Sequence, residues 1–398
     1  GYGFQGSGSR GDWRRGATTP GFGAEFKHAL LTRPGPWEFW IGGWGECLPR
    51  PDNRVALHPT LKDKWGIPAL HIQCTFGPNE LEMLKDMQVT AAEVLVTAGG
   101  QSALTCALRS LAPPGAPVLV ESPTYPGLLA IARAAGLRPV PVPVDADGVI
   151  PERLEEAFAV SGARLFVCQP LFQNPTGTVL PAGRRRAVLA AAKRAGAFVV
   201  EDDFARLLAH PGAGELPAPL VADDPDGTVV HVRSLTKAAS PSLRVGALVA
   251  RGPALARLRS VQAVDSFFVP RPLQEAALEL VTAADWPRHL RALARELADR
   301  QQLFAAALAQ RAPALLPPLL PRGGFHLWLP LPAQLDPAAF TAAALRHGVA
   351  LSPGRNYFTA EPAPRTRVSL AAAETRAQLA TAVDRLAAAL ESLDRPPS

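Results

Sequence analysis

The most constraining feature of this chain is an alternation, beginning near residue 94, between short apolar segments and longer amphipathic ones. The longer segments, such as 103–111 and 184–196, repeat Ala, Leu and Arg with a helical period. The apolar segments are VLVT, PVLVES, RPVPVPVD, ARLFVCQP, AFVVED, TVVHVRS and RVGALVA. Strands that are apolar on both faces need helices on both faces. We therefore expect an α/β domain with a mainly parallel sheet sandwiched by helices.

A second pattern follows this domain. A helical stretch runs from Trp286 to about Gln310, and then come a strand (HLWLPLP), a helix (PAAFTAAALRHG), a short strand pair and a last amphipathic helix at 374–393. The order predicts a large domain at 94–285 and a smaller C-terminal α/β domain at 286–398. Residues 1 to about 40 are rich in Gly, Arg and Trp without either period, so we expect an irregular N-terminal segment. The chain begins with Gly1 and not Met, which is typical of a fragment or a processed chain.

Composition excludes several classes of protein. With 47% hydrophobic and 19% charged residues, extensive disorder is not expected. The net charge is +6, but the basic residues are scattered along the chain and form no basic tract. This distribution argues against direct binding of nucleic acid. Four distant cysteines without C-x-x-C spacing predict neither a zinc site nor a disulfide framework, but buried free thiols. No apolar run is long enough for a membrane helix and no signal segment is evident, so we expect a cytoplasmic protein.

Polar clusters follow several of the predicted strands, where open α/β sheets bind ligands. After VLVT, the backbone N–H groups of Gly99, Gly100 and Gln101 open a helix and could bind a phosphate, although a glycine pair there is usually only a tight turn. After the next strand, Tyr125 in ESPTYPG could lie on a flat ring or simply cover the domain edge. Asn174 stands in QNPTG, which taken alone is an ordinary turn.

Three acids end the strand AFVVEDDF. Glu201, Asp202 and Asp203 need a cationic partner if they are buried, and otherwise they form a solvated strand terminus.

The most specific cluster is VVHVRSLTKAASPSLRVGALVA. Lysine is scarce in this chain, yet Lys237 follows directly after an apolar strand. A lysine among apolar neighbours loses proton affinity and becomes a nucleophilic amine, as Schiff-base chemistry requires. Ser234 and Arg244 on either side could hold a phosphate, the arginine through its planar fork. The alternative is a surface lysine after a strand, and four agreeing clusters disfavour it.

Together these motifs resemble fold-type I pyridoxal-phosphate-dependent aminotransferases. TAGGQSAL, ESPTYPG, QNPTG, VVEDDF, SLTK with its downstream Arg, and RTRVSLAAA occur in that family's order and rough spacing over residues 94 to 398. The pattern looks most similar to the aminotransferase-like domain of MocR-type regulators and to aminoadipate-type aminotransferases. The resemblance implies pyridoxal 5′-phosphate as cofactor, amino acid and 2-oxo acid substrates, and a homodimer.

The resemblance also implies roles for single residues. Lys237 would carry the cofactor as a Schiff base and later move the substrate α-proton, while Asp202 would pair with the protonated pyridine nitrogen. Asn174 would hydrogen-bond the phenolic oxygen and Tyr125 would stack on the ring. The phosphate would be held by Ser234, Arg244 and the Gly99, Gly100 and Gln101 turn. Arg367 would bind the substrate carboxylate, with Arg365 as the fallback.

Two features depart from the family pattern. Phe204 stands where the family usually has Tyr, so one hydrogen bond to the phenolic oxygen is missing. In place of the family's N-terminal portion, residues 1–93 resemble a fragment of a glucose-methanol-choline flavin oxidoreductase that lacks the nucleotide fingerprint and the catalytic histidine. We therefore expect no flavin and no metal, and a junction near residues 94–97.

Three functions remain open from the sequence. The first is an aminotransferase. The second is a weakly catalytic cofactor-binding effector domain of a MocR-type transcription regulator that lacks its DNA-binding domain. The third, a flavin oxidoreductase, is disfavoured by the missing fingerprint.

Overall fold

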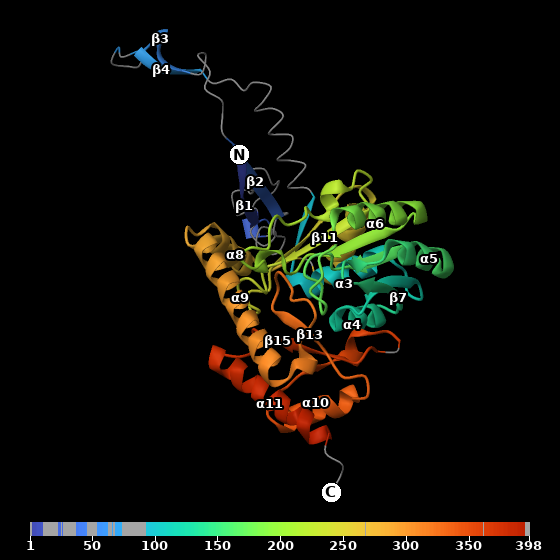
Figure 1. Cartoon of the computed structure of the whole chain (residues 1–398). Helices are drawn as coiled ribbons and strands as arrows, with labels where there is room; N and C mark the ends of the chain where they lie inside the picture. Colours follow the sequence, from blue (N-terminus) through green and yellow to red (C-terminus); the bar gives the residue numbers. More distant parts are fainter. Residues whose placement is uncertain are drawn as a thin grey trace. The chain divides into compact units, whose positions relative to one another are not determined.

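The computed structural model describes four strands before residue 74, the single residues 23, 24, 26 and 66, and residues 93–394 apart from 267 and 361. The chain divides into two compact units, 1–93 and 94–398 (Figure 1). Cys47 and Cys74, which we expect to be thiols, lie outside the described residues.

The N-terminal unit contains two antiparallel strand pairs. Strand β1 (Tyr2–Arg10) pairs with β2 (Trp37–Gly45), and β3 (Arg54–Lys62) pairs with β4 (Pro68–Gln73). The expectation of loop at residues 1 to about 40 is therefore wrong for β1 and for the start of β2. The aromatic residues of WEFW favour a strand. Pairing between segments so far apart cannot be seen in the local period of either one.

The large sheet of the second unit has eight strands in the order β5-β12-β11-β10-β9-β6-β7-β8. Its central strands β11, β10, β9, β6 and β7 run parallel, which confirms the predicted mainly parallel sheet. The edge strands β5 and β8 pair antiparallel with their neighbours, and so does β12, which lies between β5 and β11. The bounds are β5 Val94–Thr97, β6 Pro117–Ser122, β7 Arg138–Asp145, β8 Gly148–Val149, β9 Leu165–Cys168, β10 Phe198–Asp202, β11 Val229–Ser234 and β12 Gly246–Ala250.

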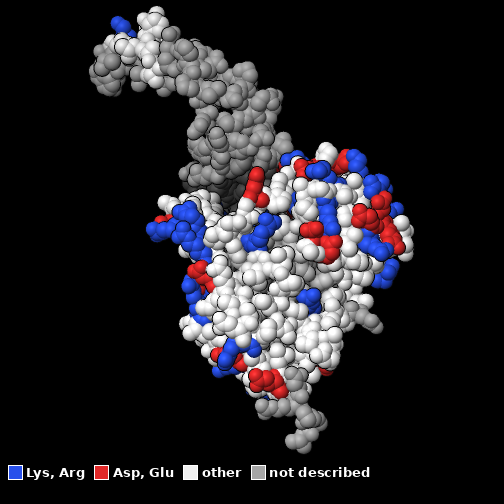
Figure 2. Space-filling view, viewed as in Figure 1, with Lys and Arg blue, Asp and Glu red and all other residues white. Residues whose placement is uncertain are grey.

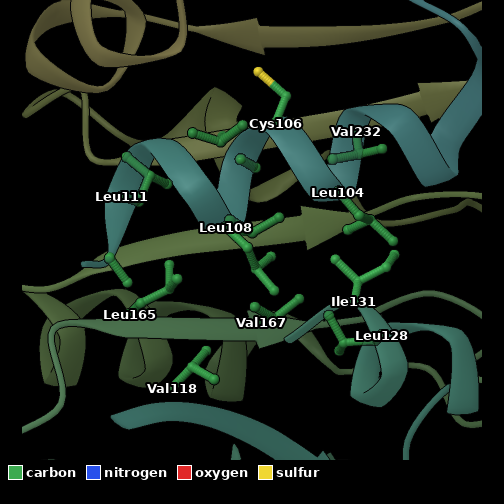
Figure 3. Packing of buried hydrophobic residues seen from close by; sticks show 14 of the residues in the cluster. Leu104, Cys106, Leu108, Leu111, Val118, Leu128, Ile131, Leu165, Val167 and Val232 are labelled. Carbon is green, nitrogen blue, oxygen red and sulfur yellow. The ribbon is translucent and has the colours of Figure 1, made fainter. Parts of the chain in front are cut away.

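Helices cover both faces of this sheet because successive strand residues point to opposite sides. Val118 and Val120 of β6 pack in a cluster with α3 (Gly99–Leu111), α4 (Pro126–Ala134) and α7 (Gly252–Asp265). Leu119, between them, packs with α5 (Pro151–Ser161) and α6 (Ala182–Ala195). Figure 3 shows Leu108 of α3 lying over the sheet, close to Val167 of β9. Full burial of such a side chain stabilises the fold by about 1.5–3 kcal/mol.

A smaller antiparallel sheet follows, in the order β13-β15-β14. This sheet packs against the C-terminal helices through a second apolar cluster, which includes Phe304, Leu327 and Phe340 (orange and red in Figure 1). The bounds are α8 Arg271–Thr282, α9 Trp286–Arg311, β13 His326–Pro330, α10 Pro337–Arg346, β14 Ser352–Pro353, β15 Arg365–Ser369 and α11 Arg376–Asp394. Short 3₁₀ turns lie at Arg206–Leu208, Leu220–Asp223, Pro313–Leu315 and Gly354–Tyr357.

The described surface carries mixed charge. On the face shown in Figure 2, basic and acidic side chains of residues 94–394 are interspersed, with no basic stripe. Cys106 and Cys168 are buried free thiols, as expected. None of the helices that the structure describes is both long enough and apolar enough to span a membrane.

Candidate active site

A cavity of about 370 Å³ opens where the parallel strands end. Its floor comes from residues at the carboxyl ends of β9, β10 and β11, and its other wall comes from β13 and β15 of the smaller sheet. The lining residues are Gly100, Gln101, Leu104, Tyr125, Gln169, Asn174, Asp202, Phe204, Ser234, Thr236, Lys237, Arg244, Phe325, His326, Arg367 and Ser369. The two sheets together therefore form one site from residues more than two hundred positions apart.

One end of the cavity is built to bind an anion. Helix α3 begins there, and no side chain caps its first N–H groups. Arg244 crosses this turn, donating from Nη2 to the carbonyl of Ala98 at 2.7 Å. A Cβ on Gly99 would stand 3.0 Å from Arg244 Nη2, and one on Gly100 would stand 3.4 Å from Ser234 Cβ. The glycines therefore leave space for this cradle of N–H, hydroxyl and guanidinium donors.

The backbone at Arg244 is itself unusual. Its φ is 49°, in the left-handed region, which costs an L-residue about 1–2 kcal/mol. Such a conformation is retained where the surrounding structure fixes it, as at many functional sites.

Asp202, the last residue of β10, also lines the cavity. It is only 6% exposed and accepts a hydrogen bond from Gln169 Nε2 at 2.6 Å. Burial raises the pKa of Asp202 to about 6, although the Gln169 hydrogen bond opposes this rise. The carboxylate is thus poised to ionise fully beside a positive group in the cavity.

Gln169 connects Asp202 with Asn174. Its Oε1 accepts from the Asn174 backbone N–H at 3.1 Å, while its own backbone N–H donates to Glu121 Oε2 at 3.0 Å. Gln173 Nε2 also donates to this Glu121 oxygen, at 3.3 Å. Glu121 is buried, and burial raises its pKa to about 7. This network fixes Asp202 and Asn174 relative to each other from below the cavity.

The other two acids of the EDDF motif are structural. Glu201 is fully buried and accepts from His231 Nδ1 at 2.9 Å and from Arg185 Nη2 at 3.3 Å. Asp203 is buried beside Arg206. The alternative of a solvated strand terminus is therefore wrong, because each of these acids has a cation or a hydrogen-bond donor beside it.

Lys237 follows β11 and projects into the cavity. It is partly covered there but still accessible to solvent, and Nζ lies 5.5 Å from the centroid of the Phe325 ring. Partial burial lowers the pKa of Lys237, and the nearby cations Arg367 and Arg244 lower it further. The fraction of neutral, nucleophilic amine is thereby raised at neutral pH.

Arg367, on β15, faces Lys237 from the smaller sheet. Its Nη1 donates to Asn174 Oδ1 at 3.1 Å and to His326 Nε2 at 3.0 Å. Its guanidinium also lies 5.4 Å from the centroid of the Tyr357 ring. Arg367 Nε is buried without a hydrogen-bond partner. A half-buried cation whose Nε has no partner is suited to binding a carboxylate.

The cavity therefore brings together the predicted residues Gly100, Gln101, Tyr125, Asn174, Asp202, Phe204, Ser234, Lys237, Arg244 and Arg367. Tyr125 sits half-buried before α4, with its ring over Gly127. Gly99 lies beneath Arg244 and is not part of the cavity wall, and the fallback Arg365 does not line the cavity.

Sequence reasoning missed Gln169, His326 and Phe325. Gln169 follows directly after the strand ARLFVC, so the strand-end rule applied elsewhere would have found it. His326 and Phe325 had no such signal, because nothing in the sequence tells which end of the smaller sheet faces the larger one. Among the described residues no cluster of three or more His, Cys, Asp or Glu could hold a metal ion.

Comparisons with known proteins agree with this geometry. The model of the family "Aminotransferase class I and II" matches residues 82–386, beginning 12 residues before Val94. The 2-aminoadipate transaminase of Thermus thermophilus is 31% identical over 371 residues, covering 92% of each chain. About 366 residues of this chain are therefore aligned, more than the 305 from 94 to 398, so the similarity extends into the first 93 residues.

This chain is also similar to a transcription regulator and to an enzyme of known structure. The HTH-type transcriptional regulator YdfD of Bacillus subtilis is 27% identical over 272 residues, which cover 68% of this chain and 56% of that protein. This chain spans little more than half the length of several such regulators. The crystal structure of α-aminoadipate aminotransferase LysN from Thermus thermophilus, complexed with N-(5′-phosphopyridoxyl)-L-leucine, is 31% identical, with a TM-score of 0.70 over 80% of this chain and 82% of that one.

The family model matches most of the chain, and the cavity at the strand ends contains the residues that the family motifs predict. This chain therefore belongs to the class I and II aminotransferases.

Proposed function

We propose that this chain is a pyridoxal-phosphate-dependent aminotransferase that moves an amino group between an amino acid and a 2-oxo acid. The observation that carries the proposal is the content of one cavity: an amine with a lowered pKa, a buried carboxylate, an anion cradle and a half-buried arginine with an unused donor. Each group is a separate requirement of this chemistry.

The cofactor that the family and the solved relative indicate is pyridoxal phosphate. The residues present fit it. The cradle of Gly100, Ser234 and Arg244 suits a phosphate, and the unfilled space above the glycines is where it would lie. Asp202 would pair with the ring nitrogen and Asn174 would hydrogen-bond the phenolic oxygen, as their fixed separation through Gln169 allows. Phe204 adds an apolar wall without the hydroxyl group of the usual Tyr.

When bound, pyridoxal phosphate supplies an aldehyde carbon for an amine and a ring that withdraws electrons from the substrate α-carbon. The residues of the chain do the remaining work. Lys237 Nζ would hold the cofactor, and the same amine could take the substrate α-proton as a general base. Ionised Asp202 keeps the paired nitrogen protonated. Tyr125 covers one side of the cavity and limits the access of water.

Arg367 would bind the α-carboxylate of the substrate. Its Nη1 is committed to Asn174 and His326, which leaves the edge with the unpartnered Nε for a carboxylate. A carboxylate bound there would hold the α-carbon in the same cavity as the amine of Lys237, the proposed proton acceptor.

The test is reconstitution of the purified chain with pyridoxal phosphate, followed by visible absorption spectroscopy. We expect the band of lysine-bound cofactor, and conversion of this band to that of the aminated cofactor on addition of amino acids. Lys237→Ala should abolish the band. The matched control is Lys193→Ala, which removes an exposed lysine of α6 that pairs with Asp226. This substitution should leave the band unchanged.

A second function is favoured by the similarity to HTH-type regulators. In that case the chain would bind the cofactor as an effector domain with weak catalysis. A band that forms but never converts, with any of the twenty common amino acids, would support this function and contradict the first.

Further predictions from the sequence remain part of the proposal. We divide the second unit into a large cofactor-binding domain at 94–285 and a small domain at 286–398. We also propose a homodimer in the cytoplasm and a first segment that binds no flavin. The resemblance of the whole of 1–93 to a glucose-methanol-choline oxidoreductase is not kept, because the similarity to aminotransferases begins before residue 94.

A further inference from the structure

His326 lines the cavity, and the proposed function leaves it without a role. It begins β13, where its ring contacts Phe325 at 4.0 Å between centroids and its Nε2 lies 3.0 Å from Arg367 Nη1. A guanidinium has donors only, so Nε2 must be the acceptor. His326 is therefore neutral in this arrangement, with its proton on Nδ1.

The surroundings of His326 favour this neutral form. Burial lowers its pKa well below the ordinary range, and the cations Arg367 on β15 and Lys237 after β11 lower it further. No carboxylate contributes in the opposite direction. At neutral pH the ring thus keeps its Nε2 lone pair available to Arg367.

The hydrogen bond limits how Arg367 can turn. Its Nη1 is shared between two acceptors from different parts of the fold, Asn174 Oδ1 after β9 and His326 Nε2 on β13. Two acceptors at one nitrogen fix the plane of the guanidinium and leave Nε free at the opposite edge. An arginine side chain carries about 2 kcal/mol of rotamer entropy, which substrate binding would otherwise have to remove.

We propose that His326 is a positioning residue that orients Arg367 for the substrate carboxylate by accepting a hydrogen bond from its Nη1. The inference rests on the proposed function. It goes further in assigning the affinity for the carboxylate to a pair of residues on the smaller sheet, and not to Arg367 alone. His326 itself does not touch the reacting atoms in this account.

The test compares three substitutions at this position. His326→Gln can place an amide oxygen near the position of Nε2, whereas His326→Asn is too short and His326→Leu has no acceptor. The main readout is the dissociation constant of a 2-oxo acid for the reconstituted protein, from titration of the visible band. We expect this dissociation constant to rise about tenfold or more in the Asn and Leu variants, because each loses one hydrogen bond to a charged group. In the Gln variant it should stay near the original value.

Further readouts separate positioning from structure. The Michaelis constant for an amino acid should rise with little change in kcat, and the affinity for pyridoxal phosphate should not change. With an amine donor that has no carboxylate, all three variants should behave as the unmodified chain. In the background of Arg367→Met, His326→Asn should have no additional effect.

Two results would overturn the inference. One is an unchanged dissociation constant in the Asn variant while the unmodified chain shows a normal band; the proposed function would then stand alone. The other is an equal loss in the Gln and Asn variants together with weaker cofactor binding, which would show a structural role. Absence of the band from the unmodified chain would instead contradict the proposed function.

Discussion

The two walls of the cavity hold their ionisable groups in different ways. On the large sheet, the buried acids Asp202 and Glu121 receive hydrogen bonds from the amides of neighbouring segments, and burial raises the pKa of both. On the smaller sheet, burial lowers the pKa of the bases Arg367 and His326, which share one hydrogen bond. Burial favours the neutral form on both sides, but only the acids are held by a network within their own wall.

This difference indicates a division of tasks. The acidic wall is fixed as the large sheet folds, which suits groups that must hold a rigid ring. Arg367 of the smaller sheet donates a hydrogen bond to Asn174, which follows β9 of the large sheet, so this contact needs both sheets. A group that depends on both sheets is suited to sensing a substrate. Substitutions on the basic wall should therefore affect substrate affinity, and those on the acidic wall should affect the cofactor and the stability of the fold.

The largest effect is expected from Arg367→Met. The Michaelis constant for an amino acid should rise about 100-fold or more, since removing one member of a buried charged pair costs about 2–5 kcal/mol. The visible band should still form, because the cofactor groups lie on the other wall. Arg365→Met, two residues earlier on β15 and outside the cavity, is the control. Equal effects of the two substitutions would contradict the assignment.

Glu121→Gln should change how stability depends on pH. A raised pKa means that the folded state binds a proton more tightly, so the contribution of Glu121 is present below about pH 4.5 and lost as pH rises through about 7. The difference of 2.5 pH units, 7 minus 4.5, corresponds to about 3 kcal/mol.

The measurement is urea unfolding of the cofactor-free chain at pH 5 and pH 8. The unmodified chain should lose more stability between these values than the Gln variant, in which an amide oxygen can still accept from Gln169. If the two chains lose the same amount, Glu121 does not titrate as the structure indicates.

Asp202→Asn should lower kcat by about 10- to 100-fold, because a charge-assisted hydrogen bond is worth about 1.5–3 kcal/mol. The Michaelis constant should change little, in contrast to Arg367→Met. Steady-state kinetics of the two variants side by side would test the division between the walls. A larger change in the Michaelis constant than in kcat for Asp202→Asn would contradict it.

The smallest effect is expected far from the cavity, at Glu296 on α9. Arg376 and then Arg300 lower its pKa to about 2, yet the side chain is 38% exposed and solvent screens the charges. Glu296→Gln should cost less than about 1 kcal/mol, and less still at high salt. Thermal melting at low and high salt checks this. A loss comparable to that of a buried group would show that exposure is a poor guide to these ion pairs.

Much of the part of the site that lies on the large sheet could be predicted from the sequence. Asp202, Asn174 and Lys237 each stand at or after the end of an apolar strand, and the ends of parallel strands meet at one edge of a sheet. Arg367 was placed by resemblance alone. His326 could not be predicted, because its contact with Arg367 depends on the register of β13 against β15. The pairing of β1 with β2 was missed for the same reason, since it joins segments far apart in the chain.

The central claim is that one particular amine carries the cofactor. The chain has six lysines, so reduction of the reconstituted protein with borohydride, tryptic digestion and mass spectrometry can identify the modified one. The account predicts stoichiometric addition of the phosphopyridoxyl group within Ser234–Arg244, at Lys237. Modification at Lys193 or another lysine, with Lys237 unmodified, would contradict it.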